Sequence, residues 1–302
     1  MGTVLYSKQA LNITDQISLL EKRGVLIEDP SFAHQVLETV SYYRFTAYLY
    51  PFRKNDGTDS YIPGTSFNQC WQYYRFDRKL RFCVIDAIER VEVAVKAQIV
   101  NHISTKYGPF AYRDKSIFAV PVDLAQFNKL LLFIDSETKK SKEEFVEHFR
   151  SSYDTSHGLP FWMAVEVMTF GNMLTFFRLL KKKDKQAIAK FFGSNERVFE
   201  SWLNNLNYVR NICAHHGRLW NRQLAVNPLI PAKNSKWNEN TYPINVNRIY
   251  STLCILKSLL DVIAPQSNWK SRFYSLLANF PMIHRVSMAI PDNFENSAIW
   301  VN

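Results

Sequence analysis

One stretch of the chain, residues 207–222, gathers side chains that can move protons and hold phosphate. His215 and His216 are adjacent, and Arg210 and Asn211 precede them by one to two helical turns. A histidine titrates near neutral pH and can accept or donate a proton. An arginine can hold a phosphate through two hydrogen bonds, and an asparagine can orient a histidine ring or bond a phosphate oxygen. These residue types therefore predict chemistry at a phosphodiester.

The same set is sufficient for RNA cleavage without a metal ion. The ribose supplies its own nucleophile, the 2′-hydroxyl, so the protein needs a proton acceptor, a proton donor and a positive clamp for the transition state. In this interpretation one of the two histidines transfers the proton and an arginine clamps the scissile phosphate. The asparagine orients the histidine or bonds the phosphate.

The spacing of these residues limits how they can cooperate. Asn211 and His215 are four apart and share a helix face, whereas Arg210 and His215 are five apart and point about 140° away from each other. One regular helix cannot readily aim both at a single phosphate. Either the helix loosens between Cys213 and Gly217, or two copies build a composite site, which predicts an isologous homodimer.

Two other interpretations of the histidine pair remain open. Histidines near a helix C-terminus can simply cap carbonyls and favour the helix dipole, and His216 just before Gly217 suits that role. A metal site is disfavoured because Asp, Glu or Cys at regular spacing is missing and two adjacent histidines cannot easily bind one ion. We therefore expect no metal and no other cofactor.

The charge of the chain favours a polyanionic partner. Lys and Arg number 37 and Asp and Glu 27, a formal charge of +10, and clustered cations gain affinity for nucleic acid by releasing phosphate counterions. We predict RNA contacts from arginines spaced by three, from a basic run near a helix end and from the arginines that follow the histidines. These residues are Arg75, Arg78, Arg81, Arg178, Lys181, Lys182, Lys183, Arg218 and Arg222. Core packing and helix ion pairs explain most of the spaced arginines equally well, and a solvated face that is favourable at a helix C-terminus explains the basic run equally well.

The elements that must position these residues are helical. Glycines number only 9, and few stretches alternate like strands. Helices are expected over residues 7–23, 67–105, 122–134, 141–150, 161–183, 196–216, 245–263 and 267–277, with one more after the start signal at Asp29-Pro30. The predicted fold is all-α. Its domains are an N-terminal helical subregion (1–65), a helical body (66–265) and a C-terminal helix and tail (266–302).

Several classes of protein are excluded or disfavoured by composition. The four cysteines lie far apart with no Cys-x-x-Cys pair, so a zinc ribbon or a thioredoxin-type site is not expected. The first thirty residues lack the pattern of a signal peptide, and no apolar run approaches the roughly 20 residues of a membrane helix. We expect a soluble protein of the reducing cytoplasm with no membrane association.

The motif also resembles that of a known group. Arg210 to His215 resembles the Arg-Asn-x-x-x-His signature of HEPN ribonucleases, and the longer string through Asn221 resembles the Abi-like (AbiD/AbiF) abortive-infection family. Three further segments are similar to that family, and the similarity as a whole spans about residues 5 to 260. They are 41–45 with Tyr48, then 77–81 with 88–92, then 160–162 with Glu166 and 170–171.

The resemblance implies a HEPN-like helical bundle with metal-independent endoribonuclease activity. It implies dimerisation that pairs two Arg/His motifs, a role in phage defence, and for some relatives restraint by a small structured RNA in a toxin–antitoxin manner. Arg210 and His215 would be the catalytic pair, and Asn211 would be the polar residue that adjusts their environment. His216 could take the place of His215, because its distance along the chain from Arg210 also fits the signature. The alternative function is a non-catalytic RNA-binding protein that uses the same fold as a scaffold or sensor.

Overall fold

The computed structural model describes residues 5, 7, 9–232, 234–238 and 243–301, and over these residues the protein is all-α. Three isolated β-bridges occur among them, but no strand. None of the described helices is both long enough and apolar enough to cross a bilayer.

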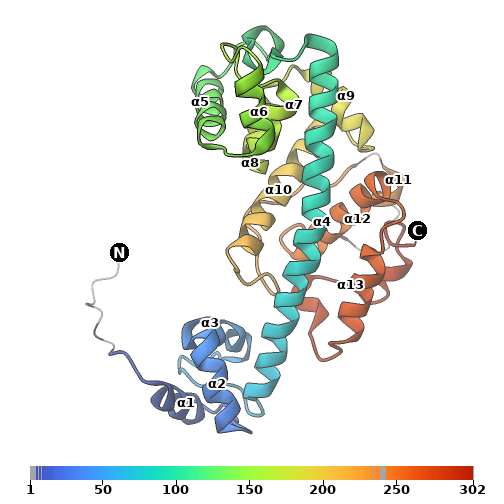
Figure 1. Ribbon diagram of the computed structural model, residues 1–302. Helices are drawn as coiled ribbons and strands as arrows, with labels where there is room; N and C mark the ends of the chain where they lie inside the picture. The colour runs from blue at the N-terminus through green and yellow to red at the C-terminus, as the bar shows by residue number, and fades with distance from the viewer. Residues whose placement is uncertain (1–4, 6, 8, 233, 239–242, 302) are drawn as a thin grey trace. The chain divides into compact units, whose positions relative to one another are not determined.

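The helices follow one another along the chain as shown in Figure 1. The α-helices are α1 (Ile13–Lys22), α2 (Pro30–Val40), α3 (Tyr42–Leu49), α4 (Phe67–Tyr107), α5 (Leu124–Lys140), α6 (Glu144–Ser152), α7 (Phe161–Ala164), α8 (Phe170–Leu179), α9 (Lys182–Phe191), α10 (Glu196–Ala214), α11 (Ser235–Asn238), α12 (Ile249–Ile263) and α13 (Trp269–Ala278). Short 3-10 turns are η1 (Tyr50–Phe52), η2 (Ala111–Arg113), η3 (Lys115–Ile117), η4 (Val165–Val167), η5 (Arg285–Met288) and η6 (Phe294–Asn296).

The chain forms two compact units. The first comprises residues 1–80 with 275–283, and the second comprises 81–274 with 284–302. Helix α4 contributes residues to both units, because the division falls between Leu80 and Arg81. The domain boundary expected at residue 65 lies just before α4, whereas the first unit extends over the opening turns of that helix.

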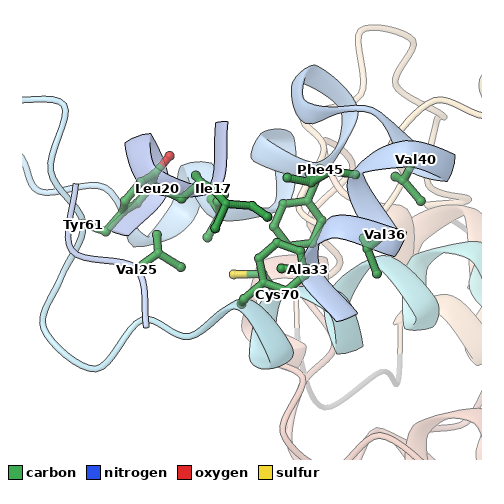
Figure 2. Close-up of a cluster of buried hydrophobic side chains, with 12 residues drawn as sticks. Ile17, Leu20, Val25, Ala33, Val36, Val40, Phe45, Tyr61 and Cys70 are labelled. Atoms are coloured by element: carbon green, nitrogen blue, oxygen red, sulfur yellow. The ribbon is translucent and has the colours of Figure 1, made fainter. Parts of the chain in front are cut away.

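The first unit is organised around a small apolar core. Figure 2 shows side chains from α1, α2, α3 and the start of α4 pointing into it, among them Leu20, Val36, Phe45 and Cys70. The ring of Phe45 stacks on that of Phe67 at a centroid distance of 4.2 Å. Burial of these apolar side chains is the main source of stability for the unit.

Two helix starts in this unit show how capping decides where a helix begins. The first helix begins at Ile13, not at residue 7 as expected, because the Asn12 side chain accepts the Asp15 N–H at 2.8 Å and caps the helix there. In α2 the Asp29 side chain accepts the Phe32 N–H and Pro30 follows as the first helical residue, so the predicted start signal is confirmed.

In the second unit, α4 supplies the central apolar stripe. Val84, Ile88, Val91 and Val95 recur at three- or four-residue steps and are fully buried, as the periodicity predicts. The helix runs to Tyr107, two residues beyond the expected end. Helix α10 packs against α8, α9 and α12.

The prediction of a single helix over 161–183 is wrong, because this segment is broken into α7, η4, α8 and the start of α9. Thr169 caps α8 by accepting the Asn172 N–H. At the other end Leu180 is extended and forms a bridge with Phe118. Pairing with the 118–119 segment therefore ends α8, and α9 begins two residues later.

Candidate functional site

Helix α10 carries the predicted motif and is firmly seated in the second unit. Its Asn195 cap accepts two backbone N–H groups, and its inward face is buried along its whole length. The buried side chains of this face include Trp202, Leu203, Leu206, Val209 and Ile212. The helix therefore presents its polar residues on a rigid support.

The end of α10 is closed by a Schellman-type pair of hydrogen bonds. The Gly217 N–H donates to the Ile212 carbonyl at 2.8 Å, and the His216 N–H donates to the Cys213 carbonyl at 3.0 Å. His216 has φ +55°, the left-handed conformation that glycine usually adopts at this place. The backbone of His216 thus has the capping role that its position before Gly217 suggests.

Position 217 requires a glycine because the backbone there lies close to Ile212 of α10. A Cβ added there would lie 3.1 Å from Ile212 Cγ2 and 3.2 Å from the Ile212 carbonyl oxygen, which is tighter than ordinary contact. The chain turns back over the last turn of α10 at this point. A side chain at residue 217 would push the loop away from the helix.

Three of the predicted catalytic side chains are available to a ligand. Asn211 and His215 are exposed and Arg210 is half-buried. Within the described part of the chain, none of the three side chains makes a hydrogen bond or an ion pair to another residue. An arginine, an amide and an imidazole therefore lie at one helix end without protein partners.

The helix does not loosen before the histidine. The His215 N–H still donates to the Asn211 carbonyl at 3.0 Å, so helical geometry reaches His215. Arg210 and His215 consequently keep a separation of about 140° around the helix axis, with Asn211 between them. Of the two arrangements that the spacing allows, a loosened helix before His215 is therefore not observed.

The segment that follows the motif is anchored at several points. Leu219 and Trp220 are fully buried. Arg248, just before α12, donates to the Asn221 side chain at 3.1 Å, and Arg222 donates to the Arg218 carbonyl at 3.4 Å. The sequence gives no signal for Arg248, since its contact depends on how α12 packs.

Arg81 does not have the exposed position that an RNA contact needs. Its side chain is buried at 7% exposure, and it donates to the Gly217 carbonyl at 3.4 Å. The spacing of three from Arg78 suggested one exposed stripe, but the helix face at residue 81 is covered. Arg81 supports the loop after the histidines from inside the second unit.

Comparison with known proteins identifies the family. A family model described as "Abi-like protein" matches residues 35–221, which is more than half of the chain. The chain belongs to the Abi-like protein family. No curated protein and no solved structure shows significant similarity to it. Membership of the Abi-like family implies a role in abortive-infection phage defence.

The matched region of this Abi-like protein ends with the loop that closes the candidate site. It runs from α2 to Asn221, and so contains α4, α8 and all of α10 with its Schellman-type end. The match therefore includes Arg210, Asn211, His215 and His216. The abortive-infection family expected from the sequence is confirmed.

The basic run of the Abi-like protein begins a helix rather than ending one. Arg178 lies in the last turn of α8, but Lys181, Lys182 and Lys183 occupy the cap and first turn of α9. The expectation that these lysines lie at a helix C-terminus, where cations are favourable, is therefore wrong. They lie at the N-terminus of α9, the positive end of the helix dipole.

Part of this basic run is neutralised by α10. Glu200 pairs with Arg178 at 3.6 Å and with Lys185 at 3.2 Å, and Glu196 pairs with Lys182 at 3.8 Å. Arg178 also donates to the Asn204 side chain. Lys181 and Lys183 are exposed and, among the residues described, form no ion pair. The charge of Lys181 does act on a nearby carboxylate, because it helps to lower the pKa of Asp114.

A buried carboxylate fixes the start of α9 to α4. Asp184 is 1% exposed and accepts hydrogen bonds from His102 at 2.8 Å, Lys106 at 2.7 Å and Tyr107 at 2.9 Å. Burial alone would raise the pKa of Asp184, but these hydrogen bonds outweigh burial and hold the pKa below its ordinary value. Asp184 is therefore an anion that holds the first turn of α9 against α4.

Most of the net charge belongs to the second unit. Residues 1–80 and 275–283 hold 9 basic and 8 acidic residues, a charge of 9 − 8 = +1. The second unit holds the other 28 basic and 19 acidic residues, a charge of 28 − 19 = +9. Arg75 and Arg78 are exposed on the first-unit part of α4 and add to a nearly neutral unit.

The described residues contain no group of three or more His, Cys, Asp or Glu side chains placed to hold a metal ion. All four cysteines are free thiols, and burial raises the pKa of Cys254 to about 12.

Proposed function

We propose that this Abi-like protein is a metal-independent endoribonuclease of the HEPN type that acts in abortive infection. The supporting observation is the end of α10, where Arg210, Asn211 and His215 have no partner among the described residues. Polar side chains that a rigid helix holds without protein partners are available to a ligand, and their residue types fit the roles that RNA cleavage needs.

The reaction follows from the chemistry of these side chains. The ribose 2′-oxygen attacks the adjacent phosphorus, and the bond from phosphorus to the leaving 5′-oxygen breaks. His215 takes the 2′-hydroxyl proton or gives one to the leaving oxygen. Arg210 stabilises the charge on the phosphoryl oxygens, and Asn211 orients the histidine or the phosphate. The products are a 2′,3′-cyclic phosphate and a 5′-hydroxyl.

The geometry of α10 supports a homodimer as the active form. Because Arg210 and His215 point about 140° apart on one helix, each active site would take its arginine from one protomer and its histidine from the other. RNA would also contact the exposed lysines Lys181 and Lys183. Cations at a helix N-terminus cost stability, and a local rule broken in this way indicates a functional surface.

The first experiment is a cleavage assay with the purified protein in EDTA. The wild type cuts RNA, and Arg210→Ala and His215→Ala each lower the rate by at least about 10²-fold. The matched controls are Arg197→Ala, an exposed arginine at the other end of α10, and His148→Ala, an exposed histidine on α6, which cut like the wild type. Loss of cutting in EDTA with recovery in magnesium contradicts the mechanism.

A further variant distinguishes the roles of the two histidines. His216→Ala should keep most of the activity if His215 is the proton-transfer group, because the His216 backbone rather than its ring closes the helix. The reverse pattern, with His215→Ala active and His216→Ala inactive, transfers the role to His216.

Mixing two inactive variants tests the composite site. In a dimer with shared sites, a protomer carrying Arg210→Ala and one carrying His215→Ala together form one intact site, so mixing and re-equilibration restores part of the activity. If each protomer holds a complete site, mixing restores nothing. A monomer in sedimentation that still cuts RNA overturns the homodimer.

A second candidate function rests on the charge of +9 in the second unit. A basic surface of this kind also fits a non-catalytic RNA-binding protein, including one bound by a structured regulatory RNA. Such a protein binds RNA with a steep salt dependence but yields no cleavage product. The assay in EDTA therefore distinguishes the two candidates directly.

A further inference from the structure

The loop after the histidines is held by a buried arginine from another helix. Arg81 on α4 is 7% exposed and donates from Nη1 to the Gly217 carbonyl. A guanidinium remains charged, and a buried charge is costly unless it is hydrogen-bonded. The carbonyl it meets lies at the C-terminal end of α10, where the helix dipole is negative. The charge and its acceptor are thus complementary.

Gly217 is restrained on both sides of its backbone. Its N–H donates to the Ile212 carbonyl at 2.8 Å, and its C=O accepts from Arg81. The absence of a side chain lets it approach the helix this closely. Because His215 lies only two residues earlier, the orientation of the Gly217 peptide fixes the turn from which the imidazole projects.

We propose that Arg81 is a positioning residue for His215. It acts through the Gly217 carbonyl and touches neither RNA nor the reacting atoms. This inference rests on the proposed ribonuclease function and deepens it, by adding to the motif a residue more than a hundred positions away in the sequence. A displacement of about 1 Å in a reacting group can cost about 10²-fold in rate.

The test compares Arg81→Gln and Arg81→Lys with a matched arginine on the same helix. Arg90 is half-buried on α4 and donates to Ser267 Oγ at 2.7 Å, so it also joins α4 to another segment of the second unit, but it does not touch the loop. We expect Arg81→Gln to lower kcat by about 10²-fold with KM within about twofold of the wild type. Arg90→Gln keeps kcat, and Arg81→Lys, which retains a charged donor, gives an intermediate kcat.

Hydrogen exchange gives a readout that does not depend on activity. In Arg81→Gln the amides of residues 215–222 exchange faster than in the wild type, whereas Arg90→Gln leaves them unchanged. If Arg81→Gln does not fold, Arg81→Lys carries the same two measurements. The positioning role is overturned if amides in this loop exchange equally fast in the wild type and in both Arg81 variants. It is also overturned if Arg81→Gln changes kcat no more than Arg90→Gln does.

If the wild-type protein cuts no RNA, the proposed function fails, while the exchange measurement still decides whether Arg81 holds the loop.

Discussion

The candidate site depends on individual backbone positions as much as on its charged groups. His216 takes a left-handed conformation, and a Cβ at position 217 would lie only 3.1 Å from Ile212 Cγ2. The motif Arg210 to His215 can be read from residue types and spacing alone. The roles of Gly217 and Arg81 cannot, because they arise from a close approach between segments far apart in the sequence.

At this scale we predict opposite results for two glycine substitutions. Gly217→Ala lowers the free energy of unfolding by about 1–3 kcal/mol, because the new methyl group overpacks against Ile212. Gly171→Ala meets nothing closer than 3.6 Å and lies in the first turn of α8, so stability is unchanged or rises by up to about 1 kcal/mol. Urea unfolding measures both. If the Gly217→Ala variant is as stable as the wild type, the loop accommodates a methyl group at position 217 and the close contact with Ile212 is not limiting.

At the scale of the elements, apolar periodicity predicts the long helix α4 and the motif helix α10 well. It fails at 161–183, where the helical pattern continues through Thr169 and Leu180 although the chain is extended there. A cap and a bridge to the 118–119 segment override the periodicity. Because α9 begins at this break, the lysines that the sequence places at a helix end lie at the opposite pole of the dipole from the one expected.

The two ends of α9 should respond oppositely to the same substitution. Lys183→Glu puts an acidic residue in the first turn and raises the free energy of unfolding by about 0.5–1 kcal/mol, whereas Lys190→Glu in the last turn lowers it by a similar amount. If Lys183 contacts RNA, its variant also binds more weakly and the salt slope falls by about 1. Thermal unfolding and RNA binding at several salt concentrations test both statements. An unchanged slope removes Lys183 from the RNA-binding surface.

The Asp184 cluster predicts a pH-dependent contribution to stability. Its native pKa is depressed, so the stabilisation is complete above the unfolded value of about 3.9 and is lost as the pH falls through the lower native pKa. Asp184→Asn therefore lowers the free energy of unfolding by about 1–3 kcal/mol at pH 7, and the difference from the wild type shrinks below about pH 4. The control is Asp292→Asn, at an exposed position without a hydrogen bond or ion pair to the described residues, which unfolds like the wild type at pH 7. A difference that does not depend on pH contradicts an ionised Asp184.

At the scale of the whole molecule, composition predicts an all-α, basic protein, and the sequence motifs predict the Abi-like family. Composition does not predict how the charge is distributed. The second unit carries +9 and the first +1, and this division follows from which segments fold together, including the return of residues 275–283 to the first unit. The motif and nearly all of the net positive charge thus belong to the same unit, which favours the proposed action on RNA.

Whether the ribose 2′-hydroxyl is the nucleophile is the most direct question to ask of this protein. An RNA with a mapped cleavage site is prepared with one 2′-deoxynucleotide immediately 5′ of the scissile phosphate and incubated with the protein in EDTA. We predict that cutting at that bond is abolished, while the all-ribose RNA gives a 2′,3′-cyclic phosphate and a 5′-hydroxyl. Continued cutting at the deoxy-substituted bond, or a 5′-phosphate on the product, would contradict the proposed chemistry of Arg210 and His215.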